Sequence, residues 1–379
     1  MNFELDESQE LLRSTVRKFA EKELSLEVTR NGDKFGVYPI ELDKKLAALD
    51  LYALPFPEEF GGINLGLIEL GIVGEELGRC SLDIAISYGL NIVYGLDILR
   101  FGNPEQKVEY IPKLIQGEVS FSPFMPEPFA EPNLEDSFPE TIFNGETYIL
   151  GQGHFYSLRN MGNSNIIHLI TQNNGGGKGI NLFLLPSNAP GIEMKRLGSL
   201  GLKILGINEF QVKGVKIPAE NLLGEQSKGW EVVKHSMELM RLFTCFAYVG
   251  NAQRIVDMAT NYAKEREQFG QPIGNFQSVA HTLAKMQVKV EAARLVTYRA
   301  AWLKQNGCPC AKEISIARIV SSETLVENAH DGMHIMGGYG YSREYDIERF
   351  ARGARITTFM NGPTYIHRNI IGEMIGSQL

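Results

Sequence analysis

Three glycines, Gly337, Gly338 and Gly340, stand close together after a long segment with helical periodicity. Glycine lets a backbone approach a phosphate group closely because it has no Cβ. A dinucleotide fingerprint normally follows a strand, whereas this cluster follows a helix. The pattern therefore fits two readings, a nucleotide-binding turn and the glycine cap of a helix.

A second segment of chemical interest runs from Arg266 to Gln277 and contains Arg266, Phe269 and Gly270. An arginine is a suitable partner for a pyrophosphate because its planar guanidinium donates two hydrogen bonds at once. The sequence carries no Walker loop, no HExxH pair and no GxSxG elbow. Cys308 and Cys310 flank Pro309 without a second matching pair, so we expect free thiols and no metal site.

The composition limits the class of protein. The chain has 379 residues, of which 44% are hydrophobic and 22% charged, as in a soluble protein of two or three domains. The net charge of −8 argues against nucleic-acid and membrane-surface binding. We find neither a secretory signal nor a stretch of about 18 uncharged apolar residues, and expect a cytoplasmic protein.

The elements that would position these residues fall into three blocks, and the expected fold class is α+β. We predict an all-α N-terminal domain (1–119), a small β-barrel-like middle domain (120–228) and a C-terminal four-helix bundle (229–379). Asp6 and Gln9 have capping-box spacing. Helices are expected at 40–51, 67–77, 83–101, 250–263, 278–304 and 311–336, and strands at 147–150, 166–171, 180–185 and 209–217.

The order of these blocks and several motifs resemble the acyl-CoA dehydrogenase family. The matching motifs run along the chain: 57–62, 127–128, 190–192, 266–277 and 337–341. The resemblance implies FAD as cofactor, an acyl thioester of CoA or of acyl carrier protein as substrate, and a homo-oligomer (a dimer or a tetramer). It also implies an electron-transferring flavoprotein as a redox partner.

The resemblance further implies which residues hold FAD. Arg266 and Phe269 would hold its pyrophosphate and adenosine end, and Gln277 would join them from an adjacent subunit. The backbone at Gly337 and Gly338 would approach the same cofactor, and His334 stands where the family often has Gln. Glu127 lies in the flavin-contacting loop. Tyr156 could stack on the flavin, although a core aromatic of the β domain is an equal alternative.

The chain departs from the family at the residue that matters most. Asn361 occupies the place of the usual catalytic Glu, and a neutral amide cannot take an α-proton. Some members place the base just before an arginine on an earlier helix; here that arginine is Arg241 and Met240 precedes it. Glu238 lies two residues farther back and should point elsewhere. His367 and Tyr365 could act as acid or base, but packed or solvated positions fit them better.

These departures leave three functional hypotheses. The first is an FAD oxidoreductase of acyl thioesters with altered chemistry, either an enoyl-thioester reductase or a dehydrogenase with a substitute base. The second is a catalytically silent subunit or binding protein on the same fold. The third is a flavin monooxygenase. We favour the first, because the segment 266–277 and the turn 337–340 remain recognisable.

Overall fold

The computed structural model describes residues 4–124, 138–158, 165–173 and 179–376. Helix α1 (Glu7–Glu23) begins where predicted, with Asp6 accepting from the Gln9 N–H at 2.9 Å and donating its own N–H to Gln9 Oε1 at 3.1 Å. This reciprocal pair confirms the capping box. The further N-terminal helices are α2 (Leu26–Phe35), α3 (Glu41–Ala47), α4 (Leu67–Cys80), α5 (Leu82–Phe101) and α6 (Pro104–Ile115).

Two of these helices differ from the expectation. Helix α2 was not predicted, because several of its apolar residues, such as Phe35, are exposed and give no buried stripe. The helix expected at 40–51 ends at Ala47, and Leu51 and Tyr52 are buried in the turns that follow.

Helix α5 is long and apolar enough to cross a membrane by length and composition, and 78% of its apolar window is buried inside the protein. It carries Asp83 and Asp97, which are both buried, and Asp83 accepts the Leu205 N–H at 2.9 Å. A core helix surrounded by other helices reads as apolar on all sides. The burial of α5 therefore accounts for its hydropathy.

The middle region contains two sheets packed on one core. The strands are β1 (Ser120–Phe124), β2 (Glu140–Phe143), β3 (Thr147–Leu150), β4 (Gly153–Ser157), β5 (Asn165–Asn173), β6 (Ile180–Pro186), β7 (Ile192–Leu197), β8 (Ile207–Val212) and β9 (Val215–Pro218). The larger sheet has the order β1-β5-β2-β3-β9 with β6 also paired to β5, and the smaller has the order β4-β8-β7. Phe155, Phe183 and Phe210 meet between the sheets.

The predicted strand 209–217 is in fact two strands in different sheets. The chain turns at Gly214, whose φ is 60°, and so passes from β8 to β9. A β-type sequence run does not show such a turn unless a glycine or proline is read as its centre.

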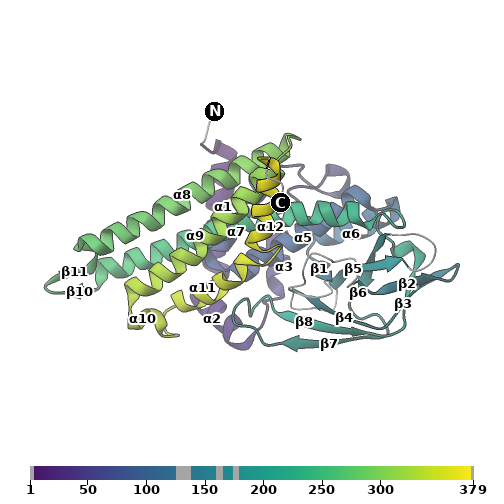
Figure 1. Cartoon of the computed structure of the whole chain (residues 1–379), viewed down its shortest axis with the longest axis horizontal. Coiled ribbons are helices and arrows are strands. Elements are labelled where there is room, and N and C mark those ends of the chain that lie inside the picture. The colour runs from purple at the N-terminus through teal and green to yellow at the C-terminus, as the bar shows by residue number, and fades with distance from the viewer. Residues whose placement is uncertain (1–3, 125–137, 159–164, 174–178, 377–379) are drawn as a thin grey trace.

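The C-terminal region contains three long helices, α7 (Gly229–Glu265), α8 (Gln277–Gln305) and α9 (Ala311–Met336). The short hairpin β10 (Glu267–Gln268) and β11 (Gln271–Pro272) joins α7 to α8 at the far end of the molecule from the sheets (Figure 1). After α9 come α10 (Gly338–Tyr341), α11 (Ile347–Ala354) and α12 (Thr364–Met374). The α+β class with helical, β and helical blocks is confirmed.

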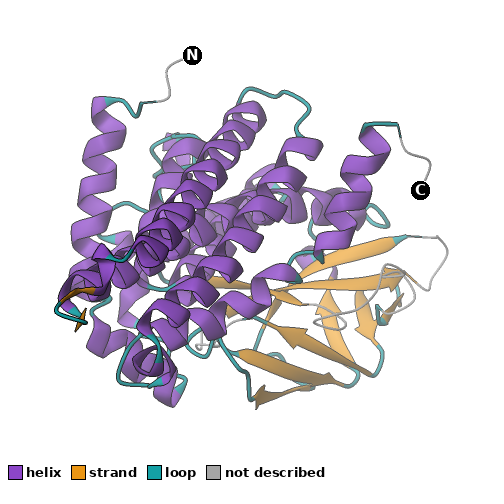
Figure 2. Ribbon diagram, turned by 60° about the vertical axis from the view of Figure 1, so that its left-hand side comes forward, coloured by secondary structure: helices purple, strands orange, loops and turns teal. Residues whose placement is uncertain are grey.

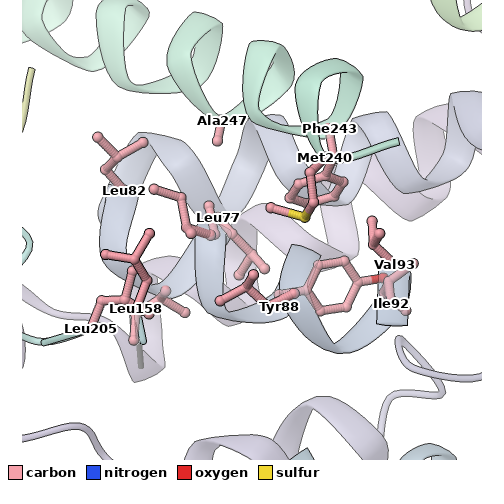
Figure 3. Close-up of a cluster of buried hydrophobic side chains, with 14 of the residues drawn as sticks. Leu77, Leu82, Tyr88, Ile92, Val93, Leu158, Leu205, Met240, Phe243 and Ala247 are labelled. Atoms are coloured by element: carbon pink, nitrogen blue, oxygen red, sulfur yellow. The ribbon is translucent and has the colours of Figure 1, made fainter. Parts of the chain in front are cut away.

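The helices form one body and the strands lie beside it (Figure 2). A single hydrophobic core joins the N-terminal and C-terminal helices, with Leu77 of α4, Tyr88 of α5 and Phe243 of α7 among its members (Figure 3). The secondary structure changes near residues 120 and 229 as expected. The shared core, however, contains residues from both sides of each boundary. The division at those boundaries stays a prediction.

His168 of β5 is buried between the sheet and α5. Its ring lies 4.3 Å from that of Tyr94 and 5.5 Å from that of Phe121, measured between centroids, and neither ring nitrogen has a hydrogen-bond partner among the described residues. Burial lowers the pKa of His168 from 6.5 to about 3, so the ring is neutral in the folded protein.

This histidine should make the fold sensitive to acid. Between pH 6.5 and about 3 the unfolded chain binds a proton at His168 that the folded chain does not, so the free energy of unfolding falls as the pH falls. The contribution at pH 5 is about 2 kcal/mol. His168→Phe should lose less stability than the wild type when urea unfolding is compared at pH 7 and pH 5. His281→Phe, at an exposed position, should behave as the wild type does. Equal losses for the wild type and His168→Phe would contradict this assignment.

Candidate active site

Asn361 lies in a tight turn between the 3₁₀ segment Arg355–Thr358 and α12. Its φ is 59° and that of Gly362 is 107°, a left-handed pair that asparagine and glycine tolerate best. Arg241 of α7 donates its Nε–H to the Asn361 carbonyl oxygen at 3.1 Å. The structure therefore brings together the two residues that the sequence singled out for catalysis. The side-chain nitrogen of Asn361 is buried and has no hydrogen-bond partner among the described residues.

A third residue, Arg318 of α9, also contacts this turn and was not identified as a site residue from the sequence. Its side chain is only 1% exposed, and one terminal nitrogen donates to the carbonyl oxygens of Thr357 and Met360. Its guanidinium also lies 5.0 Å from the Tyr248 ring centroid. The available signal was a lone arginine within the apolar run of residues 314–320.

The site is electropositive. In the part of the chain that the structure describes, neither Arg241 nor Arg318 makes an ion pair with a carboxylate. Burial, and then the charge of Arg318, lower the pKa of Arg241. Glu238 forms an ion pair with Lys304 at 2.6 Å, so it does point elsewhere, and among the residues that the structure describes no carboxylate forms an ion pair with either arginine of the turn.

His367 of α12 lies beside the same turn. Its side chain is buried, its Nδ1 lies 3.4 Å from Ser315 Oγ, and its Nε2 has no partner in the described structure. Burial first, and then the charges of Arg241 and Arg318, lower the pKa of His367 to about 3. A neutral ring of such low basicity is a poor proton acceptor at neutral pH. Tyr365 is 46% exposed.

A second site is a surface hollow of about 600 Å³ at the far end of α7 and α9. Arg266, Gly337, Gly338 and Tyr339 line it, and the Arg266 guanidinium lies 5.8 Å from the Tyr339 ring centroid. A Cβ at Gly337 or Gly338 would meet no atom within 4 Å. The open backbone and the exposed cation are the features that a phosphate-binding surface needs.

The other residues that we expect to hold FAD at this end are all exposed, but they do not line the hollow. Phe269 is 93% exposed in the β10–β11 turn and Gln277 is exposed at the start of α8. His334 is exposed on the last turn of α9, with its ring 6.4 Å from that of His330 between centroids. In a single chain these side chains therefore lie on the surface and do not form a closed pocket.

Tyr156, which we expect to contact the flavin ring, lies toward the opposite end of the molecule. Tyr156 is half-buried on β4, and its neighbour Ser157 is buried with a hydroxyl that has no hydrogen-bond partner among the described residues. Glu127 lies outside the described residues. Figure 1 shows β4 at one end of the molecule and the β10–β11 hairpin at the other. The structure therefore does not bring Tyr156 together with Arg266 within a single chain.

Two family descriptions match the chain, "Acyl-CoA dehydrogenase, N-terminal domain" over residues 6–118 and "Acyl-CoA dehydrogenase, C-terminal domain" over residues 227–376. A probable acyl-CoA dehydrogenase of Bacillus subtilis is 32% identical over 379 residues, covering 99% of this chain and 100% of the relative. The chain belongs to the acyl-CoA dehydrogenase family.

Other proteins similar to this acyl-CoA dehydrogenase family member are named as a reductase subunit and as an oxidase. The CarC subunit of the caffeyl-CoA reductase-Etf complex of Acetobacterium woodii is 31% identical and covers 97% of this chain and 98% of its own. The solved structure of the prolyl acyl carrier protein oxidase AnaB superposes with a TM-score of 0.91 at 27% identity, covering 99% of this chain and 100% of its own.

Members of the family bind FAD, and complexes with FAD are among the similar structures. The residues of this chain fit that cofactor. The open backbone at Gly337 and Gly338, together with the Arg266 guanidinium, suits its phosphates. The buried hydroxyl of Ser157 has no hydrogen-bond partner among the described residues and can bond a polar group of the cofactor.

The role of Arg318 can be tested by stability. Arg318→Met leaves two buried carbonyl groups without their donor and should lower the free energy of unfolding by about 2 kcal/mol. Arg299→Met is the matched control, because Arg299 is 60% exposed and pairs with Glu313 only at 3.6 Å. It should cost less than about 1 kcal/mol. Unchanged or higher stability of Arg318→Met in urea unfolding would show that Arg318 does not hold the turn.

Proposed function

We propose that this protein is an FAD-dependent oxidoreductase that reduces α,β-unsaturated acyl thioesters. The observation that carries the proposal is Asn361, an uncharged amide where the family has a carboxylate, in a turn held by two arginines with no carboxylate partner. The family membership supports the cofactor and the thioester class, and the site chemistry supports the direction.

Oxidation of a saturated thioester needs a group that removes a proton from its α-carbon. Asn361 has no basicity for this, Glu238 is bound to Lys304, and the His367 ring has a pKa of about 3. Losing a positioned base typically costs about 10²–10⁴-fold in rate. Desaturation should therefore be the slow direction for this site.

Reduction of an unsaturated thioester requires no base, but it does require groups that stabilise negative charge on the thioester carbonyl oxygen. Reduced FAD, when bound, would supply the hydride for the β-carbon of an unsaturated thioester, and water would supply the proton for the α-carbon. Negative charge develops on the thioester carbonyl oxygen along the way. The backbone N–H of Asn361 is a donor that no side-chain replacement removes, and the positive field of Arg241 and Arg318 favours that charge.

The proposed partners follow from the family membership and from the distance between the Tyr156 end and the Arg266 end of the molecule. A thioester on CoA and one on an acyl carrier protein both suit the site, because the two carriers present the same reacting group. An electron-transferring flavoprotein is the proposed electron donor, supported by the name of the CarC relative. A second copy of the chain would bring its Arg266 hollow to the Tyr156 end of the first, which supports a homodimer or homotetramer.

Restoring the carboxylate should restore oxidation. Asn361→Glu should raise desaturation of an acyl-CoA by about 10²–10⁴-fold, measured as anaerobic bleaching of the flavin absorbance. Asn361→Gln is the matched control: Gln has the side-chain length of Glu without its charge and meets the same left-handed backbone strain as Glu does, so it should show no gain. A Glu variant that binds FAD and thioester yet gains no activity would place the reacting carbon elsewhere. A purified protein that is colourless and rejects added FAD would instead support a silent subunit.

A further inference from the structure

Helix α12 begins at Thr364, directly after the Asn361 turn, without a capping side chain. The residue at its N-cap is Pro363, and no side chain accepts a hydrogen bond from the first turn of the helix. The N–H groups of a first turn carry partial positive charge and attract an anion. Water can satisfy such groups equally well, so the start of the helix does not by itself make a binding site.

Unpartnered side-chain nitrogens converge on the same place. The point where a Cβ would stand on Gly362 lies 3.4 Å from Arg241 Nη2 and 3.4 Å from His367 Nε2. The side chain of His367 is 1% exposed, and its Nε2 has no hydrogen-bond partner among the described residues. The buried Nδ2 of Asn361 has none there either. Buried polar groups in proteins are normally paired, so these two nitrogens lack a group that accepts hydrogen bonds.

The place also carries positive charge that no described carboxylate neutralises. Arg241 donates its Nε–H to the Asn361 carbonyl, and the charge of the buried Arg318 acts on it as a like charge. An anion beside the two arginines would offset their repulsion. Arg241, Asn361 and Gly362 are each partly exposed, so a small group can approach from solvent.

We propose that the start of α12 is a binding site for a carboxylate group, which Arg241, His367 and Asn361 hold by hydrogen bonds. A carboxylate has two oxygens and accepts hydrogen bonds from a guanidinium and from neutral N–H groups at the same time. Ser315 Oγ lies 3.4 Å from His367 Nδ1, and when this hydroxyl donates, the ring proton stands on Nε2 and faces the site.

Two sources can bring the carboxylate, a separate small acid and the acyl part of the thioester itself. In the second case the substrate is a monothioester of a dicarboxylic acid, and this case alone rests on the proposed function. The two sources share one chemistry at the site, and they differ in whether a thioester is needed for binding.

The first measurement uses no thioester. Acetate is titrated into the FAD-loaded protein by calorimetry at low ionic strength, with acetamide as its neutral counterpart. Acetamide should bind at least about tenfold more weakly, because a hydrogen bond to a charged group is the stronger one. Arg241→Gln removes the charge and Asn361→Asp fills the site with its own carboxylate, so each should weaken acetate binding at least about tenfold. Arg299→Gln, at an exposed position of α8, is the matched control and should bind as the wild type does.

The second measurement identifies the source. Succinyl-CoA and butyryl-CoA have acyl chains of the same length, and succinyl carries a carboxylate where butyryl carries a methyl group. Binding is followed by the change in flavin absorbance. If the substrate brings the carboxylate, the wild type binds succinyl-CoA at least about tenfold more tightly, and Arg241→Gln removes this preference. Equal affinities together with acetate binding assign the carboxylate to a separate small acid.

The proposal is overturned if acetate binds no better than acetamide and succinyl-CoA has no advantage over butyryl-CoA. It is also overturned if folded, FAD-containing Arg241→Gln and Asn361→Asp variants keep both the wild-type affinity for acetate and the wild-type preference between the thioesters. Failure of both thioesters to bind would refute the proposed function, whereas the acetate titration would still decide the carboxylate site.

Discussion

Two guanidinium groups, that of the buried Arg318 and that of the half-buried Arg241, hold the turn on which the whole site depends. Arg318 donates to the carbonyls of Thr357 and Met360, and Arg241 donates to that of Asn361. Each arginine satisfies backbone acceptors where a carboxylate would ordinarily neutralise it, so the site keeps an uncompensated positive charge. Burial first, and then that charge, lower the pKa of His367, and the charge favours negative charge on whatever group enters.

Helix α7 connects this electrostatic arrangement to the rest of the fold. One side of it packs through Phe243 and Phe246 on α4 and α5, and another side carries Arg241 and Tyr248 toward α9. The N-terminal helices and the C-terminal helices therefore share a core, and the helix that joins them in it also contacts the Asn361 turn. The hollow at Arg266, which we expect to bind phosphate, is at the other end of the same helix, away from the sheets. Within a single chain the two groups of residues that we expect to hold FAD, those near Arg266 and those near Tyr156, lie at opposite ends.

Much of the fold could be predicted from hydrophobic periodicity and from the capping, glycine and proline residues that begin and end elements. The capping box at Asp6, the long C-terminal helices and most strands are local signals, and the motif order identified the family. Helix α2 and the turn at Gly214 were missed because exposed apolar residues and one glycine carry little pattern. At the site, motif positions singled out Asn361 and Arg241, and the structure shows that the two are in contact. Arg318 and the seating of Phe243 on Gly89 could not be read from the sequence, since both depend on contacts between residues far apart in the chain.

The central claim is that no residue of this site removes the α-proton of a bound thioester. The most direct measurement is hydrogen exchange at that carbon. The FAD-loaded protein is incubated with butyryl-CoA in deuterated buffer, and deuterium in the recovered thioester is measured by mass spectrometry. The account predicts incorporation no faster than in buffer alone. Rapid, enzyme-dependent incorporation at the α-carbon would contradict it, because it would show that the chain has a working base.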